Sequence, residues 1–90
     1  MILAKLTSEQ IDAVTLEVLR EDRRLLPLPI VALRVVYRAA LMPPMTEEGR
    51  ETTRDETERV TASLQRLDAL RLAKHAKRAG GPDVWTVRSA

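Results

Sequence analysis

Residues 60–72 read VTASLQRLDALRL, the most clearly periodic segment of this 90-residue chain. Its apolar residues recur at helical spacing along one face: Val60, Leu64, Leu67 and Leu70. Just upstream, residues 53–56 read Thr-Arg-Asp-Glu, the form of a capping box in which Thr and Glu side chains satisfy free backbone N–H groups. The pattern predicts a helix over residues 54–71.

Two short segments follow this helix, separated by Gly-Gly-Pro-Asp at residues 80–83. The second segment, residues 84–88, is β-branched and aromatic, which favours a strand. Two such segments around a Gly-containing turn are typical of a β-hairpin. We therefore predict a hairpin over residues 72–88.

Further helices are expected before residue 54. A second capping box at Thr7–Gln10 opens a predicted helix over residues 8–24, whose apolar stripe consists of Ile11, Val14, Val18 and Leu19. Residues 30–41 are densely apolar, and their β-branched run makes a strand the competing interpretation. The Ala-rich continuation favours a helix, which Pro43 ends. Over residues 46–53, with Thr46 as N-cap, only a short, weak helix is predicted.

Length and composition indicate one small domain spanning residues 1–90, because a chain of this size supports a single core. There is no Phe, one Trp and one Tyr, so the core must be mostly aliphatic, and we expect Trp85 and Tyr37 to lie in it. Without Cys, no disulfide framework is possible. The apolar start is too short for a signal peptide and no run is long enough to span a membrane, so we expect a cytoplasmic protein. The expected fold class is mainly α with a small β-hairpin.

Positive charge is concentrated at the C-terminal end. The net charge of the chain is +2. Residues 1–53 hold seven basic and eight acidic side chains, whereas residues 71–90 hold five basic side chains against Asp83 alone, for a net charge of +4. A positive cluster beside a periodic helix favours a polyanionic partner more than the overall charge does.

Residues 30–88 resemble the winged helix-turn-helix family of transcription regulators. The likeness is carried by residues 60–72, because a recognition helix in that family commonly shows Val, Leu four residues later, Leu three after that, an acidic residue, and a further Leu that starts the wing strand. Gly80-Gly81 and residues 84–87 fall where the family has its wing and final strand. Three positions depart from the pattern: the usual Leu-Ala pair of the second helix is Gly49-Arg50, and the usual Gly after the recognition helix is Arg71.

The resemblance implies that the helix over residues 54–71 enters the major groove and that the hairpin contacts the DNA backbone or the minor groove. The positions that could face DNA on the helix are Arg59, Thr61, Ala62, Ser63, Gln65 and Arg66. Those on the hairpin are Lys74, Lys77, Arg78 and Arg88. Ordinary solvated faces are the alternative explanation for both sets. The helix over residues 8–24 lies outside the family pattern as an extra N-terminal helix.

The sequence contains little that would support a catalytic or metal site. There is no Gly-rich phosphate loop, and His75, the single histidine, has no Cys or second His to share a metal ion. We therefore expect no enzyme activity, no cofactor and no small-molecule substrate.

The sequence thus predicts a DNA-binding transcription regulator, such as a phage or small bacterial repressor. A homodimer on double-stranded DNA is expected, joined through the N-terminal helix, although the same stripe could pack on residues 30–41 within one chain. The alternative is a winged-helix module that docks on proteins without binding DNA. A third possibility is a helical adaptor in which residues 72–88 form an irregular tail.

Overall fold

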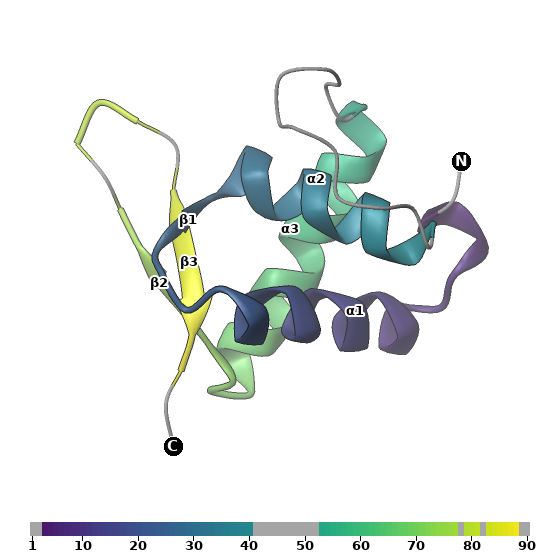
Figure 1. The fold of residues 1–90 in the computed structure, drawn as a ribbon, viewed down its shortest axis with the longest axis horizontal. Coiled ribbons are helices and arrows are strands. Elements are labelled where there is room, and N and C mark those ends of the chain that lie inside the picture. The colour runs from purple at the N-terminus through teal and green to yellow at the C-terminus, as the bar shows by residue number, and fades with distance from the viewer. Residues whose placement is uncertain (1–2, 41–52, 78, 82, 89–90) are drawn as a thin grey trace.

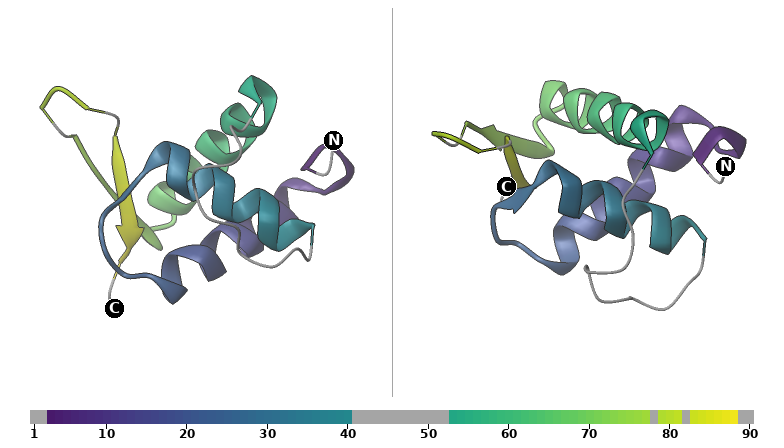
Figure 2. Two further views of the ribbon diagram at one scale, coloured as in Figure 1. Left: turned by 45° about the horizontal axis from the view of Figure 1, so that its top comes forward. Right: turned by 90° about the horizontal axis from the view of Figure 1, so that it is seen from above.

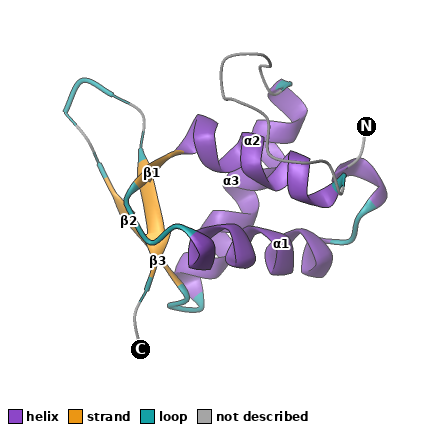
Figure 3. Ribbon diagram, viewed as in Figure 1, coloured by secondary structure: helices purple, strands orange, loops and turns teal. Residues whose placement is uncertain are grey.

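The computed structural model describes residues 3–40, 53–77, 79–81 and 83–88. Within these ranges the chain forms three α-helices and a small antiparallel sheet at one end of the helices (Figure 1, Figure 3). A single 3-10 turn, η1 (Leu3–Lys5), precedes them and buries Leu3 completely. The prediction of a mainly helical fold with a β-hairpin is confirmed.

Helix α1 (Ser8–Glu21) begins at the predicted capping box and ends before the predicted Arg24. The backbone N–H of Thr7 donates to Gln10 Oε1 at 2.8 Å, and the N–H of Gln10 donates to Thr7 Oγ1 at 3.1 Å. At the other end, Asp22 Oδ1 accepts from the N–H of Arg24 at 3.2 Å. This local bond holds the backbone in a turn, which explains why the helix stops early.

Helix α2 (Leu28–Ala39) starts two residues before the predicted Ile30. The prediction treated Pro29 as a residue that precedes the helix, but it occupies the first turn, where a missing N–H costs nothing. Its buried residues cover more than one side of the helix, as the dense apolar content of the segment suggests: Val31, Ala32, Leu33, Val35, Val36 and Tyr37. Leu41 and the predicted short helix over 46–53 fall outside the described residues, apart from Thr53.

Helix α3 (Arg54–Ala69) begins at the predicted capping box of residues 53–56, where Thr53 Oγ1 and the Glu56 carboxylate each accept a backbone N–H. It ends two residues before the predicted Arg71, which lies in the left-handed region at φ 61°. The N–H of Arg71 bonds to the carbonyl of Asp68 at 2.9 Å, and that of Leu72 bonds to the carbonyl of Leu67 at 2.8 Å. These two bonds form a Schellman motif, which normally has Gly in the left-handed position.

Arg71→Gly is expected to raise the free energy of unfolding by about 0.5–1 kcal/mol. A side chain in the left-handed region costs about 1–2 kcal/mol, and the greater freedom of Gly in the unfolded chain offsets part of that gain. Urea unfolding followed by circular dichroism measures the difference. Gln65→Gly, at an exposed position inside α3, is the control and should lower stability by about 1 kcal/mol. Equal losses in both variants would contradict the assigned conformation of Arg71.

The sheet contains the predicted hairpin and a strand that the sequence did not predict. Strands β2 (Ala73–Ala76) and β3 (Val84–Val87) pair with Ala73 opposite Val87 and Ala76 opposite Val84. Strand β1 (Leu26–Pro27) pairs with the other edge of β3, giving the order β1-β3-β2. Sequence analysis assigned no element between the helices over residues 8–24 and 30–41, because two strand residues are too few to show any alternation.

The core lies between the three helices and one face of the sheet. Helix α1 packs against both α2 and α3, and Figure 2 shows the three helices gathered beside the sheet. The α1 stripe is covered within the chain, with Ile11, Val18 and Leu19 buried and Val14 partly buried against the core. Of the two roles considered for this stripe, a dimer contact or packing within one chain, the structure shows the packing within one chain.

Aromatic residues occupy the predicted core positions, whereas Leu70 does not. Trp85 is 4% exposed and Tyr37 is 5% exposed. Leu70 was expected on the buried face of the helix but is 66% exposed, because the helix ends before it and the chain turns away at its C-cap.

Candidate functional site

The solvent face of α3 is polar and carries no excess of positive charge. Its exposed residues are Arg54, Glu58, Gln65, Asp68 and Ala69. Thr61 and Ala62 lie half-buried at the edge of this face, and the Thr61 hydroxyl donates to the carbonyl of Thr57 at 2.7 Å. Of the predicted positions on this helix, Gln65 is thus the most accessible.

Two of the three arginines on α3 are paired with acidic residues of the same helix. Arg59 Nε lies 2.7 Å from Asp55 Oδ2, and Arg54 Nε lies 3.1 Å from Glu58 Oε1. Both pairs are four residues apart, the spacing at which helix side chains meet. They are solvent-exposed pairs of small energy, so Arg59 can exchange Asp55 for another anion at little cost.

Ser63 was expected on the exposed face of the helix, and the structure contradicts this. Its side chain is fully buried between α3 and α1, where its hydroxyl donates to Asp12 Oδ1 at 2.6 Å and lies 3.1 Å from Thr15 Oγ1. The small polar side chain fits against α1 because Asp12 and Thr15 supply acceptors there. Ser63 cannot reach a ligand that approaches α3 from solvent.

Arg66 is held by α1. Its Nε and Nη2 atoms both lie about 3 Å from the Asp12 carboxylate, at 3.0 and 2.8 Å, in a bidentate ion pair. Burial alone would raise the pKa of Asp12, but the hydrogen bonds from Arg66 and Ser63, together with the Arg66 charge, outweigh it and lower the pKa below its usual value. Arg66 therefore serves the packing of α3 on α1.

The predicted cations of the hairpin point to solvent. Lys74, Lys77 and Arg88 are exposed, and none has a carboxylate partner among the residues that the structure describes. Arg78, the fourth predicted position, lies outside the described residues. The hairpin thus keeps charges that nothing in the described chain neutralises.

Cations that have a carboxylate partner and cations that have none lie largely in different parts of the molecule. Arginines with carboxylate partners are Arg24, Arg34, Arg38, Arg54, Arg59 and Arg66. Cations without one, over the described ranges, are Lys5, Arg20, Arg23, Arg71, Lys74, Lys77 and Arg88. Apart from Lys5, the unpaired cations lie near the C-terminal end of α1, after α3, or on the hairpin.

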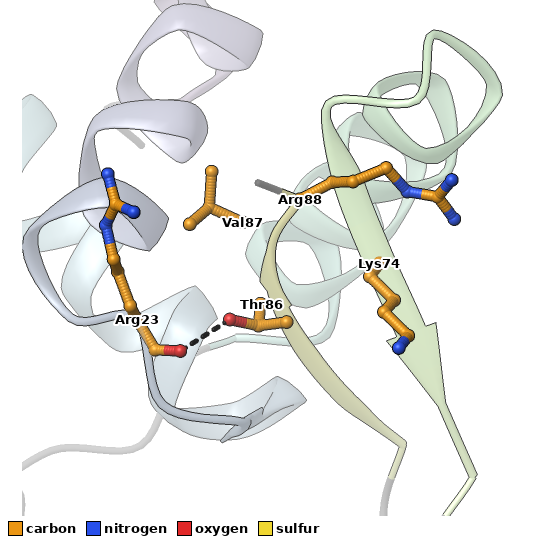
Figure 4. A pocket seen from close by; sticks show the side chains of 5 residues that line it. All are labelled: Arg23, Lys74, Thr86, Val87 and Arg88. Atoms are coloured by element: carbon orange, nitrogen blue, oxygen red, sulfur yellow. Dashed lines mark hydrogen bonds between the residues drawn. The ribbon is translucent and has the colours of Figure 1, made fainter. Parts of the chain in front are cut away.

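Three of these unpaired cations line one pocket at the base of the hairpin (Figure 4). Its lining residues are Arg23, Lys74, Thr86, Val87 and Arg88. The Thr86 hydroxyl donates to the carbonyl of Arg23 at 2.7 Å, which joins the segment after α1 to β3. Sequence analysis missed Arg23, because only the fold brings residues near 23 beside residues near 86.

His75 is a structural residue of the hairpin. Its ring stacks on Trp85 with centroids 4.5 Å apart, and its Nε2 lies 2.9 Å from Asp83 Oδ2, close enough for an ion pair when the ring is protonated but off the direction of a hydrogen bond. Across the described part of the chain, no three His, Asp or Glu side chains gather in a way that could hold a metal ion.

The helices are all short or polar. None of those within the described ranges has the length and apolar character needed to cross a membrane.

Comparison of the chain with protein-family models, with curated proteins and with solved structures gave no match.

Proposed function

We propose that this chain is a winged helix-turn-helix protein that binds double-stranded DNA and regulates transcription. The order of elements supports the fold assignment: three packed helices, with β1 between the first two and a hairpin directly after the third. In this assignment α2 and α3 form the helix-turn-helix pair, α3 enters the major groove and the hairpin is the wing. In the same assignment α1 is the first helix of the winged helix-turn-helix domain.

The observation that carries the proposal is the segregation of unpaired cations to the hairpin end. Lys74, Lys77 and Arg88 have no acidic partner in the described chain, so no internal ion pair must break before they contact phosphates. By contrast, cations on α2 and α3 are already neutralised by nearby carboxylates. The hairpin therefore supplies most of the electrostatic attraction, independent of DNA sequence.

Base recognition falls to the remaining accessible residues of α3. Gln65 can bond to adenine with both amide atoms, Ala62 can contact a thymine methyl group, and Arg59 can reach guanine after leaving Asp55. Thr61 is a weaker candidate, because its hydroxyl already donates to the backbone. Ser63 is excluded by its burial and Arg66 is bound to Asp12.

A regulator of this kind would act in the cytoplasm by occupying its operator, as a phage or bacterial repressor does. A homodimer would bind two half-sites. Because the apolar stripe of α1 is covered within the chain, such a dimer would use the opposite, polar face of α1 or another surface.

The first test is binding of the purified protein to random-sequence duplex DNA over a salt series. We expect a dissociation constant of roughly 10⁻⁴–10⁻⁶ M near physiological salt, weakening steeply as salt rises. Lys77→Gln should weaken binding several-fold and reduce the salt slope by about 1, whereas Lys5→Gln, an unpaired Lys at the opposite end, should leave both unchanged. Folded wild type that does not bind at low salt would refute the proposal.

A second candidate function is docking on another protein, and two observations favour it. The exposed face of α3 carries Glu58 and Asp68, which repel phosphates. Beside the end of α3, Leu70 and Leu72 are 66% and 37% exposed. If the salt series shows no DNA binding, this docking function becomes the better explanation.

A further inference from the structure

The basic pocket at the base of the hairpin is a feature that the helix-and-wing arrangement does not account for. Lys74 pairs with Thr86 one step from the base of the hairpin, where Ala73 faces Val87. The pocket residues therefore lie at the end of the sheet remote from the turn that contains Ala79 and Gly80. A wing that contacts DNA only through its turn would leave this pocket unused.

Side chains in the pocket come from both sides of β3. Figure 4 shows Lys74 and Arg88 extending on the β2 side, whereas the Arg23 side chain extends on the side of α1. The hydrogen bond from Thr86 to the carbonyl of Arg23 fixes the backbone on the α1 side. Thr86 and Val87 thus lie between the cations, and the Arg23 and Arg88 head groups extend in opposite directions from β3.

Arg23 keeps its charge available although acidic residues precede it in sequence. The Asp22 carboxylate bonds to Arg24 Nη2 at 2.7 Å and to Arg34 Nη1 at 2.8 Å. Hydrogen bonds from Arg24 and Arg34 hold the pKa of Asp22 far below its usual range, so Asp22 stays ionised and committed to those partners. No carboxylate lines the pocket among the described residues.

We propose that this pocket binds phosphate groups and that Arg23 is a phosphate-binding residue. The inference rests on the proposed function, in which the phosphates belong to the backbone of duplex DNA. Arg and Lys side chains without a neighbouring carboxylate are donors for phosphate oxygens, and because they lie on both sides of β3 they can contact successive phosphates of a nucleic-acid backbone. The lining contains no aromatic side chain on which a base could stack, since Trp85 is buried, so the pocket suits the backbone and not a nucleobase.

Such a contact would extend the DNA-binding surface from the hairpin to the segment after α1. It adds a backbone contact far from the turn, which fixes the orientation of the domain without reading sequence. Free phosphate or pyrophosphate offers the same chemistry as the DNA backbone, so the experiment must separate the two sources.

Arg23→Gln is the test variant and Arg20→Gln is the matched control, since Arg20 is also exposed and unpaired but does not line the pocket. We expect Arg23→Gln to weaken binding to random duplex DNA about threefold to tenfold and to lower the salt slope by about 1, while Arg20→Gln changes neither. Circular dichroism checks that both remain folded.

Nuclear magnetic resonance with pyrophosphate as the probe gives a second measurement. The amide signals of Thr86 and Arg88 should shift in a saturable way in the wild type, more than with chloride at equal ionic strength, and should not do so in Arg23→Gln. If the wild-type signals shift in a saturable way but Arg23→Gln binds duplex DNA as tightly as the wild type, the pocket binds a free phosphate compound and not the DNA backbone. Absence of both effects would overturn the site, and wild-type duplex binding would still report separately on the proposed function.

Discussion

Leu64→Ala is expected to lower the free energy of unfolding by about 3–5 kcal/mol. The Leu64 side chain is 0% exposed in the middle of α3 and belongs to the cluster that α1, α2 and α3 share. Replacing the Leu64 side chain with a methyl group leaves a cavity between the three helices. A single domain is commonly stable by only about 5–15 kcal/mol, so a loss of this size leaves the folded state marginal.

Urea unfolding, followed both by circular dichroism and by the fluorescence of buried Trp85, measures this loss. Leu70→Ala is the matched control, because Leu70 follows the same helix but is 66% exposed. Its change should stay within about 0.5 kcal/mol. Equal effects of the two substitutions would mean that α3 does not pack through the face assigned to it.

The helices could be predicted from the sequence because their signals are local. Both capping boxes, at Thr7 and at Thr53, form the hydrogen bonds that their spacing predicts. The hairpin was predicted for the same reason, since a turn of Gly-Gly-Pro-Asp lies between two short segments. Helix ends were less well predicted, because they depend on single bonds such as that of Asp22 or on the left-handed conformation of Arg71.

Contacts between distant residues account for most of what the sequence did not reveal. Strand β1 forms because β3 offers a free edge, and not because residues 26–27 favour a strand. Ser63 and Arg66 look like polar surface residues on a helical wheel, yet the acceptor that binds them is Asp12. The pocket needs Arg23 beside Thr86, a neighbourhood that no local pattern indicates.

Asp12→Ala is expected to destabilise the fold by about 2 kcal/mol, the second large effect. The carboxylate accepts from Arg66 and from Ser63, and its side chain is 21% exposed. Removing the carboxylate leaves the Arg66 guanidinium half-buried against α1 without its charge partner. The stability lost in this way exceeds that lost when an exposed ion pair is broken. Asp68→Ala, on the exposed face of α3, is the control and should have little effect.

A double-mutant cycle of Asp12→Ala with Arg66→Ala isolates the pair, with a coupling energy of about 1 kcal/mol or more expected. The exposed pair of Arg54 and Glu58 should give no more than about 0.5 kcal/mol. The folded-state pKa of Asp12 is lowered, so the contribution of the carboxylate is fully present above its unfolded pKa of about 4 and is lost as the pH falls through its folded pKa. Stabilities of the wild type and Asp12→Asn should therefore converge in acid. If instead Arg66→Ala leaves stability unchanged and weakens DNA binding, Arg66 contacts DNA and the role assigned to Asp12 is wrong.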